Sequence, residues 1–453
     1  MEYVLNREIY QELLQWKNNK SGHVLELSGA RQVGKTFILD KFAKENFNHY
    51  IYINCAESSG EQFLKCKIEA EKWIPGEPRP ANTALKAMQL YERTFVDTED
   101  TIVVIDEIQD SKEIYNLIRQ FARYFQCCFI VTGSYLAKLL EPGFFSPVGD
   151  LDRMTLETLT FTEFLDALGY LDLYQSIDLA GGSNSEDYKI LNEKFDVYER
   201  IGGYPAVVKM YLQTKDIERC EEEIVKIVQT FLEESKRYFQ SVVDSSIFDR
   251  LLESIAVLLI KEKIGRDLVK ELSKIVLKEE SGKIGKQAVN QAVSWLHASR
   301  VIGYADKCID CNHLDVVMNQ RFYYTDLGIA NYFLTKTGEG RNNIKGILAE
   351  NFVYLSLKRH KKVAGDNPRF VIYQKTKGEL DFYVRSLIDY QNYGIEVKSE
   401  DNQSKTARRL FEDGKLDFLY YLKGDKQGGI AEGGRIITVA LYLADRIGFD
   451  LGL

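Results

Sequence analysis

Eight consecutive residues near the N-terminus have the spacing of a phosphate-binding loop, which we call the P-loop. They are Gly29, Ala30, Arg31, Gln32, Val33, Gly34, Lys35 and Thr36. Glycines at this spacing let successive backbone N–H groups curl around phosphate oxygens, and the N-terminus of a following helix adds a favourable dipole. Lys35 is then expected to reach the β and γ phosphates of ATP, and Thr36 to ligate Mg²⁺. The alternative is an ordinary glycine-rich turn.

A second group of candidate residues follows the apolar run Val103–Ile105. Asp106 closes this run and is expected to hold the Mg²⁺ shell, and the adjacent Glu107 to orient or deprotonate the attacking water. Many strands end in acidic residues, so the pattern gains its meaning from the P-loop upstream. Ser134 follows the next apolar run and is a candidate to touch the γ-phosphate or the water. A plain loop serine is the alternative for Ser134.

A third group lies near the C-terminus. Asp381 opens a predicted strand, Leu380–Val384, and Glu396 and Lys398 lie on the next one. Side chains alternate across a strand, so Glu396 and Lys398 share one face. Two carboxylates from adjacent strands can hold Mg²⁺ or Mn²⁺, and a lysine beside them can orient or activate water. Glu350, on the predicted helix Leu348–Leu357, is a candidate for a third oxygen ligand.

The elements that must position the first two groups are predicted from apolar periodicity. Short apolar runs alternate with amphipathic stretches in the first half of the chain, which is typical of a parallel sheet flanked by helices. Strands are predicted at Val24–Ser28, Tyr50–Asn54, Thr101–Ile105 and Cys128–Thr132. A helix that begins at the end of the P-loop is expected to turn inward Phe37, Leu39, Phe42 and Ala43.

The middle of the chain has the outline of a winged-helix domain. Two helices, Asp267–Val276 and Gly285–Ala298, precede a predicted hairpin of Val301–Tyr304 and Arg321–Tyr324. Lys261–Arg300 contains nine Lys or Arg against five Asp or Glu, although the whole chain has a net charge of -8. The start of the second helix gathers Lys283, Lys286, Gln287, Asn290 and Gln291. Phosphate contacts by lysines and base contacts by amides would suit DNA, and a packing module is the alternative.

Composition bounds the class of protein. With 453 residues, 45% of them hydrophobic and 28% charged, the chain is long enough for two to four soluble domains. The first residues lack the basic-then-apolar layout of a signal peptide, and the longest apolar run, near Ile255–Ile260, is too short to span a bilayer. Seven cysteines, an odd number in a large chain, fit reduced thiols. A cytoplasmic location without membrane attachment is therefore expected.

With these motifs, the chain resembles the prokaryotic AAA-type ATPases that carry a C-terminal domain of unknown function with a restriction-endonuclease-like fold. The likeness rests on the P-loop, Val103–Gln109, Ile130–Ser134 and Phe161–Phe164, and further on Gly202–Pro205, Tyr323–Gly328 and Gly346–Phe352. The chain departs from the family at Gly149-Asp150, where Gly-Arg is usual. A catalytic arginine expected there is in doubt, and Arg153 is the nearest substitute.

The expected architecture is an α/β protein in three parts. Residues 1–195 form an AAA-type P-loop ATPase domain, 196–336 a helical linker and winged helix, and 337–453 a restriction-endonuclease-like α/β domain. The first functional hypothesis is a Mg²⁺-dependent ATPase that acts on DNA, with the Asp381 centre cutting or gripping it. The rival is an ATP-driven switch or scaffold whose nuclease-like domain cuts nothing. A small-molecule kinase is disfavoured, and a homo-oligomer stays open.

Overall fold

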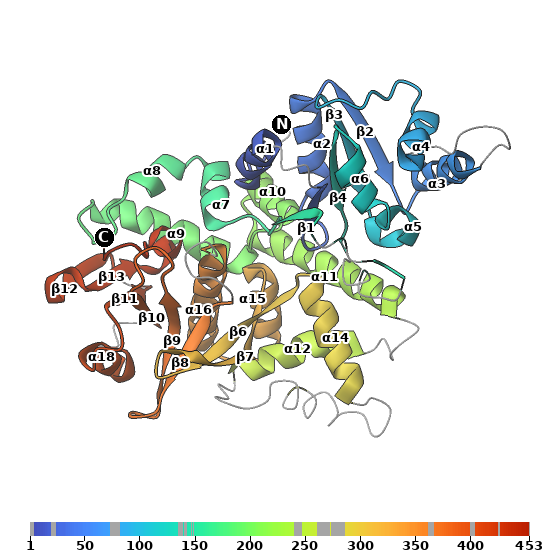
Figure 1. Cartoon of the computed structure of the whole chain (residues 1–453). Coiled ribbons are helices and arrows are strands. Elements are labelled where there is room, and N and C mark those ends of the chain that lie inside the picture. Colours follow the sequence, from blue (N-terminus) through green and yellow to red (C-terminus); the bar gives the residue numbers. More distant parts are fainter. Residues whose placement is uncertain are drawn as a thin grey trace. The chain divides into compact units, whose positions relative to one another are not determined.

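The computed structural model divides the chain into two compact units (Figure 1). It describes residues 4–19, 24–72, 82–134, 139, 143–145, 147, 149–239, 247–260, 272, 286–360, 367–398, 404–424 and 426–452. One unit, here the N-terminal unit, is Leu5–Thr158 with Ala298–Arg300, and the other, the C-terminal unit, holds the remainder. This division falls at Leu159, whereas the sequence places the end of the first domain at residue 195. Within the described residues, no helix has the length and apolar character that a membrane span needs.

The N-terminal unit is built on a five-stranded parallel sheet in the order β2-β3-β4-β1-β5. The strands are β1 Val24–Ser28, β2 His49–Asn54, β3 Thr101–Asp106, β4 Cys128–Thr132 and β5 Leu151–Thr155. The expected parallel sheet is thus confirmed. Sequence periodicity missed β5, because its Leu-Asp-Arg-Met-Thr run is only partly buried at the edge of the sheet. The P-loop connects β1 with α2 (Lys35–Asn46), at the carboxyl ends of the strands.

Helices cover both faces of this sheet. They are α1 Ile9–Asn19, α2, α3 Ser58–Glu71, α4 Thr83–Tyr91, α5 Lys112–Tyr115 and α6 Ile118–Tyr124. The crossover from β1 to β2 runs opposite to those from β2 to β3 and β3 to β4, so right-handed connections place α2 on one face and α3 to α6 on the other. In α2, Leu39, Phe42 and Ala43 are buried as expected. Phe37 is instead 50% exposed, because the helix face that packs on the sheet runs through Ile38.

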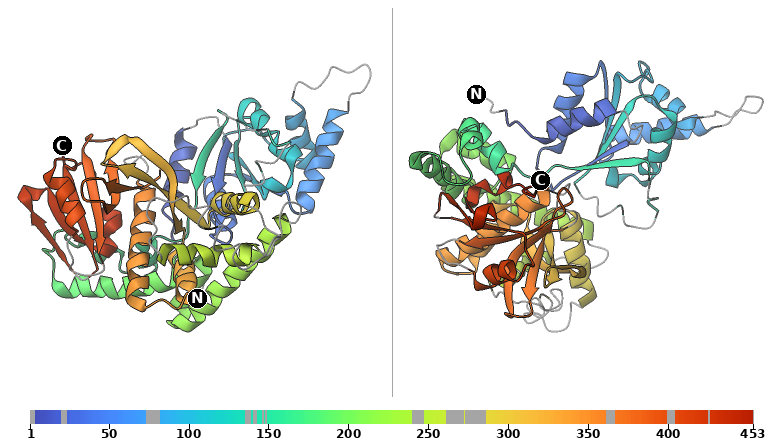
Figure 2. Two further views of the ribbon diagram at one scale, coloured as in Figure 1. Left: turned by 90° about the horizontal axis from the view of Figure 1, so that it is seen from below. Right: turned by 60° about the vertical axis from the view of Figure 1, so that its left-hand side comes forward.

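The C-terminal unit contains a mixed sheet (Figure 2). It has eight strands in the order β12-β13-β11-β10-β9-β8-β6-β7. Its strands are β6 Ile302–Ile309, β7 Asn312–Tyr324, β8 Arg369–Tyr373, β9 Gly378–Arg385, β10 Asn392–Lys398, β11 Phe418–Lys423, β12 Gly428–Ala431 and β13 Ile436–Ala440. The predicted hairpin exists as β6 and β7, with longer strands. Because β6 pairs in parallel with β8, this hairpin extends the C-terminal sheet.

The helices of the C-terminal unit precede, interrupt and cover this sheet. They are α7 Phe161–Leu168, α8 Leu171–Ser176, α9 Ser185–Ile201, α10 Pro205–Thr214, α11 Ile217–Phe239, α12 Ile247–Ile260, α14 Lys286–Ala298, α15 Leu327–Lys336, α16 Arg341–Arg359 and α18 Lys405–Glu412. From α16 onward the order is helix, three strands, helix and strand, because β8, β9 and β10 precede α18 and β11 follows it. The first predicted helix of the winged helix, Asp267–Val276, lies outside the described residues except at residue 272. The winged helix therefore stays a prediction.

Candidate functional site

The P-loop has the backbone that its glycines permit. Gly34 has φ +96° and forms the N-cap of α2. This φ lies in the left-handed region, where a residue with a side chain would have a strained backbone. A Cβ added to Gly29 would lie 2.3 Å from the carbonyl oxygen of Leu156, so only glycine fits there. The loop thus turns tightly against the neighbouring segment and delivers Lys35 to the first turn of the helix.

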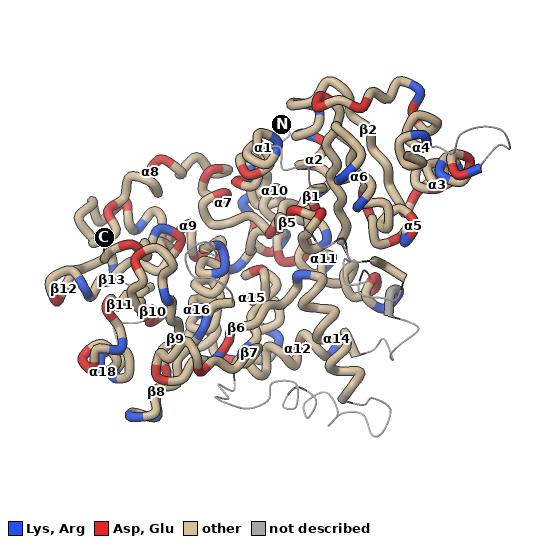
Figure 3. Tube along the Cα trace, in the orientation of Figure 1, with Lys and Arg blue, Asp and Glu red and all other residues tan. Residues whose placement is uncertain are grey.

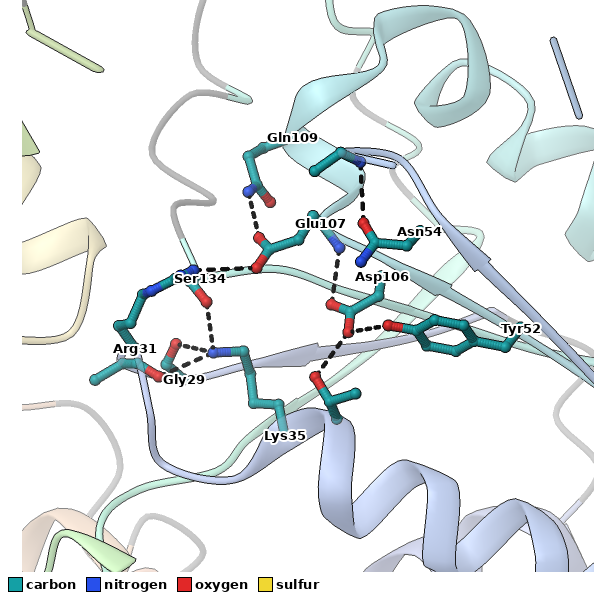
Figure 4. Close-up of polar contacts among 12 residues, drawn as sticks. Gly29, Arg31, Lys35, Tyr52, Asn54, Asp106, Glu107, Gln109 and Ser134 are labelled. Carbon is teal, nitrogen blue, oxygen red and sulfur yellow. Dashed lines mark hydrogen bonds and ion pairs between the residues drawn. The ribbon is translucent and has the colours of Figure 1, made fainter. Parts of the chain in front are cut away.

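Lys35, near the end of the P-loop, has a buried side chain. Its Nζ donates to the carbonyl oxygens of Gly29 and Ala30 at 3.0 and 2.9 Å, and to Ser134 Oγ at 3.1 Å (Figure 4). Burial lowers the pKa of Lys35 to about 8, against the opposing effect of the Glu107 and Asp106 carboxylates. The structure therefore brings Lys35 and Ser134 together, and the role of Ser134 as a sensor stays a prediction.

Asp106 lies at the end of β3 with three donors around its carboxylate. Thr36 Oγ1 donates to Asp106 Oδ2 at 2.7 Å, and the hydroxyl of Tyr52 donates to the same oxygen at 2.9 Å. The backbone N–H of Glu107 donates to Oδ1 at 2.8 Å. Thr36 and Asp106, the two expected Mg²⁺ ligands, therefore lie side by side.

Tyr52 was not singled out from the sequence. Its strand β2 pairs with β3, and Asn54 lies opposite Asp106 in the register. A tyrosine two residues before the carboxyl end of the predicted strand Tyr50–Asn54 was the available signal. Burial, followed by the charge of Asp106, raises the pKa of Tyr52 well above its ordinary value, so its hydroxyl remains a donor.

The Thr36–Asp106 pair fits a magnesium ion. Mg²⁺ prefers hard oxygen ligands and usually binds one or two protein groups together with phosphate and water oxygens. A hydroxyl and a carboxylate 2.7 Å apart supply such a pair. In the described part of the chain, no three His, Cys, Asp or Glu side chains are grouped to hold a metal ion. A magnesium ion at Asp106 would therefore draw its remaining ligands from the nucleotide and water.

Glu107 is held by two side chains. Arg31 Nη1 lies 3.3 Å from Glu107 Oε1, and Gln109 Nε2 donates to Oε2 at 2.6 Å (Figure 4). The backbone of Glu107 has φ +48°, a conformation that costs free energy and is found disproportionately at functional sites. From the sequence, Arg31 is expected to contribute only its backbone to the P-loop. Its side-chain contact with Glu107 could not be seen without the fold.

Arg153, the expected substitute for the missing arginine, lies on β5. Its Nε is 3.2 Å from Glu26 Oε1, and its side chain is 62% exposed. Asp150, which stands where the family usually has arginine, pairs with Arg119 at 3.2 Å and Arg123 at 2.9 Å. In this chain, position 150 therefore holds a carboxylate that pairs with two arginines.

The C-terminal candidates form a second cluster, within the C-terminal unit. Lys398 Nζ lies 2.6 Å from Glu396 Oε1 and 4.0 Å from Asp381 Oδ2, so Glu396 and Lys398 do share a face. Asp381 Oδ2 also accepts the backbone N–H of Val397 at 2.7 Å. Asp381 does not open its strand, since β9 begins at Gly378. The register with β8 is irregular around Asp381, as in a β-bulge, a feature that re-aims side chains beside active sites.

The charges of this cluster act on one another. Burial raises the pKa of Asp381, and the negative charges of Glu396 and Glu350 raise it further. Burial also raises the pKa of Glu396, against the opposing charge of Lys398. For Lys398, burial would lower the pKa, but Asp381 and Glu396 outweigh it and raise the value. The lysine therefore stays charged between two carboxyl groups.

Glu350 is held by two residues from β7, neither of which was a candidate site residue from the sequence. Arg321 Nη1 donates to Glu350 Oε1 at 2.8 Å, and the hydroxyl of Tyr323 donates to the same oxygen. Arg321 also pairs with Glu379. Among the described residues, Glu350, Asp381 and Glu396 are not gathered as a three-ligand metal group. The role of Glu350 as a ligand stays a prediction.

The candidate DNA-binding residues are only partly described. Lys283 lies outside the described residues, as does the side chain of Lys286. Gln287 and Asn290 are exposed on α14, whose opposite face buries Val289, Val293 and Leu296. Elsewhere, charges of both signs lie along the described helices (Figure 3). This arrangement suits a DNA-facing helix and a packing module equally.

Comparison with known proteins identifies the N-terminal region. A family model described as an AAA domain matches residues 21–165. Two models described as domains of unknown function, DUF8612 and DUF4143, match residues 192–340 and 345–429. No protein with a curated description matches the chain.

Similar solved structures include a Walker-type ATPase of Pyrococcus abyssi, 15% identical with a TM-score of 0.46, covering 73% of this chain and 96% of its own. Cdc6p from Pyrobaculum aerophilum is 13% identical with a TM-score of 0.27, covering 77% and 97%. The RuvB branch-migration motor of Thermotoga maritima is 13% identical with a TM-score of 0.31, covering 69% and 92%. All three scores are below 0.5. The family match, the parallel sheet and the P-loop together show that this chain carries an AAA-type ATPase domain.

Proposed function

We propose that the protein is a Mg²⁺-dependent ATPase whose C-terminal unit acts on DNA. One observation supports ATPase activity above all others. Four residues lie together at the carboxyl ends of the strands of one parallel sheet: Lys35, Thr36, Asp106 and Glu107. Lys35 neutralises the β and γ phosphates, and the P-loop N–H groups hold their oxygens. Thr36 and Asp106 would hold Mg²⁺, which would further neutralise the phosphate charge.

Glu107 is the residue proposed to orient the attacking water. The water oxygen bonds to the γ-phosphorus, the bond to the ADP oxygen breaks, and the water proton passes to the Glu107 carboxylate or through it to solvent. Ser134 accepts a hydrogen bond from Lys35, which supports a contact of Ser134 with a γ-phosphate oxygen. Its sensing role belongs to the same proposal.

Purified protein tests the ATPase directly. Wild type should release phosphate from ATP in a Mg²⁺-dependent way, Lys35→Ala should bind ATP poorly, and Asp106→Ala should need far more Mg²⁺. Glu107→Gln keeps the size and the metal ligands, so it should bind ATP and hydrolyse it at least about 100-fold more slowly. Hydrolysis by Glu107→Gln at the wild-type rate would remove Glu107 from the mechanism.

The action on DNA rests on the Asp381 cluster. The helix, three strands, helix, strand order from α16 to β11 supports a restriction-endonuclease-like domain over residues 337–453. A buried carboxyl group, Glu396, and a partly buried one, Asp381, beside a charged lysine support metal-dependent phosphodiester cleavage there. The winged helix at residues 196–336 would supply the grip on DNA. The alternative, an ATP-driven switch with an inactive nuclease-like domain, predicts DNA-independent ATP turnover and no cleavage.

A further inference from the structure

The ion pair between Arg31 and Glu107 links the P-loop to the residue proposed to orient water. Arg31 Nη1 and Glu107 Oε1 are 3.3 Å apart, and the two side chains are 35% and 20% exposed. Gln109 Nε2 occupies the other carboxylate oxygen at 2.6 Å. Both oxygens of Glu107 thus already have donors in this arrangement. A water molecule would have to compete with a guanidinium for the orienting carboxylate.

Arg31 also belongs to the loop that wraps the phosphates. A guanidinium carries a positive charge and suits planar, bidentate contacts with phosphate. The triphosphate end must lie near Lys35 Nζ and the Thr36–Asp106 pair, and Asp106 in turn accepts a hydrogen bond from the backbone N–H of Glu107. A γ-phosphate placed there competes with Glu107 for Arg31, whereas a diphosphate adds no charge at this end of the site.

We propose that Arg31 is a γ-phosphate-dependent switch supplied by the P-loop itself. With a triphosphate bound, Arg31 moves from the Glu107 carboxylate to the γ-phosphate, which leaves Glu107 Oε1 for water and adds positive charge where negative charge develops. When inorganic phosphate leaves, Arg31 returns to Glu107. The inference rests on the proposed ATPase function and adds to it the source of the arginine that Gly149-Asp150 lacks.

Nucleotide binding provides a test that does not depend on turnover. Calorimetry should compare ADP with the non-hydrolysable analogue AMPPNP, both with Mg²⁺, for wild type, Arg31→Ala and Arg31→Lys. Arg31→Ala should weaken AMPPNP binding by about 10- to 100-fold, as expected for a lost charge-assisted contact, and ADP binding by less than about threefold. Arg31→Lys should recover part of the AMPPNP affinity. Lys44→Ala, an exposed change on α2, is the matched control and should alter neither affinity.

The Glu107→Gln variant sharpens the test. Since it removes the competing carboxylate charge, it should bind AMPPNP a few-fold more tightly than wild type and ADP equally. Arg31→Ala should still weaken AMPPNP binding in that background. Equal losses for ADP and AMPPNP in Arg31→Ala, or no loss for either, would overturn the switch. If wild type bound nucleotide without hydrolysing it, the proposed ATPase activity would be refuted. The ratio of the AMPPNP affinity to the ADP affinity would still test the role of Arg31.

Discussion

The carboxylate of Asp326 accepts a hydrogen bond from the backbone N–H of Gly203 at 2.8 Å. Its other oxygen accepts the N–H of Ile329 at 3.0 Å and so caps α15. Asp326 is buried, with 2% exposure. Two segments far apart in the sequence, Gly202–Pro205 and Tyr323–Gly328, are therefore fastened to each other through one side chain.

Asp326→Ala should destabilise the C-terminal unit. It leaves the buried N–H of Gly203 without its acceptor and removes the cap of α15. The expected loss in the free energy of unfolding is roughly 2–4 kcal/mol, measured by urea denaturation. Asp326→Asn keeps one carbonyl acceptor and should lose about half as much. Unfolding midpoints that agree among all three proteins would contradict this account of the contact.

The backbone at Gly202 should not accept a side chain. Its φ is +69°, and an added Cβ would lie 2.3 Å from Asp326 Oδ1 and 2.4 Å from the N–H nitrogen of Gly328. Gly169, at φ +79°, is the matched control, because its Cβ would meet nothing within 4 Å. Gly169→Ala should cost about 1–2 kcal/mol, the left-handed penalty alone, whereas Gly202→Ala should cost clearly more. Equal shifts in thermal unfolding for the two variants would refute the steric argument.

The pH dependence of stability should contain a contribution from Glu199. Burial raises the pKa of this carboxyl group to about 8, with Asp196 adding to the effect and Lys345 opposing it. In the unfolded chain the group ionises near its ordinary value, so the folded state holds more protons between that value and about pH 8. Stability from this group is therefore full at low pH and falls by roughly 1.4 kcal/mol per pH unit across the window.

Glu199→Gln isolates that contribution, since glutamine keeps the shape and cannot ionise. Its free energy of unfolding, measured by urea titration, should exceed that of wild type at pH 8 and approach the wild-type value near pH 5. Parallel stability curves for the two proteins between pH 5 and pH 8 would show that Glu199 does not titrate on unfolding.

The sequence was sufficient for features that depend on local pattern. The P-loop, the strand that precedes it and the run that ends at Asp106 are all defined by short-range spacing, and the five-stranded parallel sheet confirms that part. Strand alternation likewise placed Glu396 and Lys398 on one face. These arguments need only a few neighbouring residues and a known backbone geometry.

Other features depend on contacts between distant segments. Arg31 meets Glu107 and Tyr52 meets Asp106 only because β1, β2 and β3 lie in one sheet. Arg321 reaches Glu350 because the β6–β7 hairpin joins the C-terminal sheet through β8. The sequence had assigned that hairpin to a separate domain, where no such contact would arise. Edge strands such as β12 were missed because Gly-Gly-Ile-Ala has little of the alternation that marks a half-buried strand.

The Asp381 cluster yields the sharpest prediction for the C-terminal unit. Lys398 lies beside both carboxyl groups and stays charged, but it donates no electron pair to a metal ion. Lys398→Ala should therefore keep Mn²⁺ binding, measured by calorimetry, and lose DNA cleavage. Asp381→Ala should lose both, because it removes a hard oxygen ligand.

The cleavage comparison uses duplex, single-stranded and four-way-junction DNA with Mn²⁺. Lys375→Ala is the matched control, since Lys375 is an exposed lysine of the same unit that pairs with Asp413. It should cleave like wild type. ATP hydrolysis should survive all three changes, because the P-loop site and the Asp381 cluster share no ligand. Equal, background-level nicking by wild type and Lys398→Ala would refute the nuclease and favour the ATP-driven switch, whereas nicking lost only in Lys398→Ala and Asp381→Ala would assign the cleavage to this cluster.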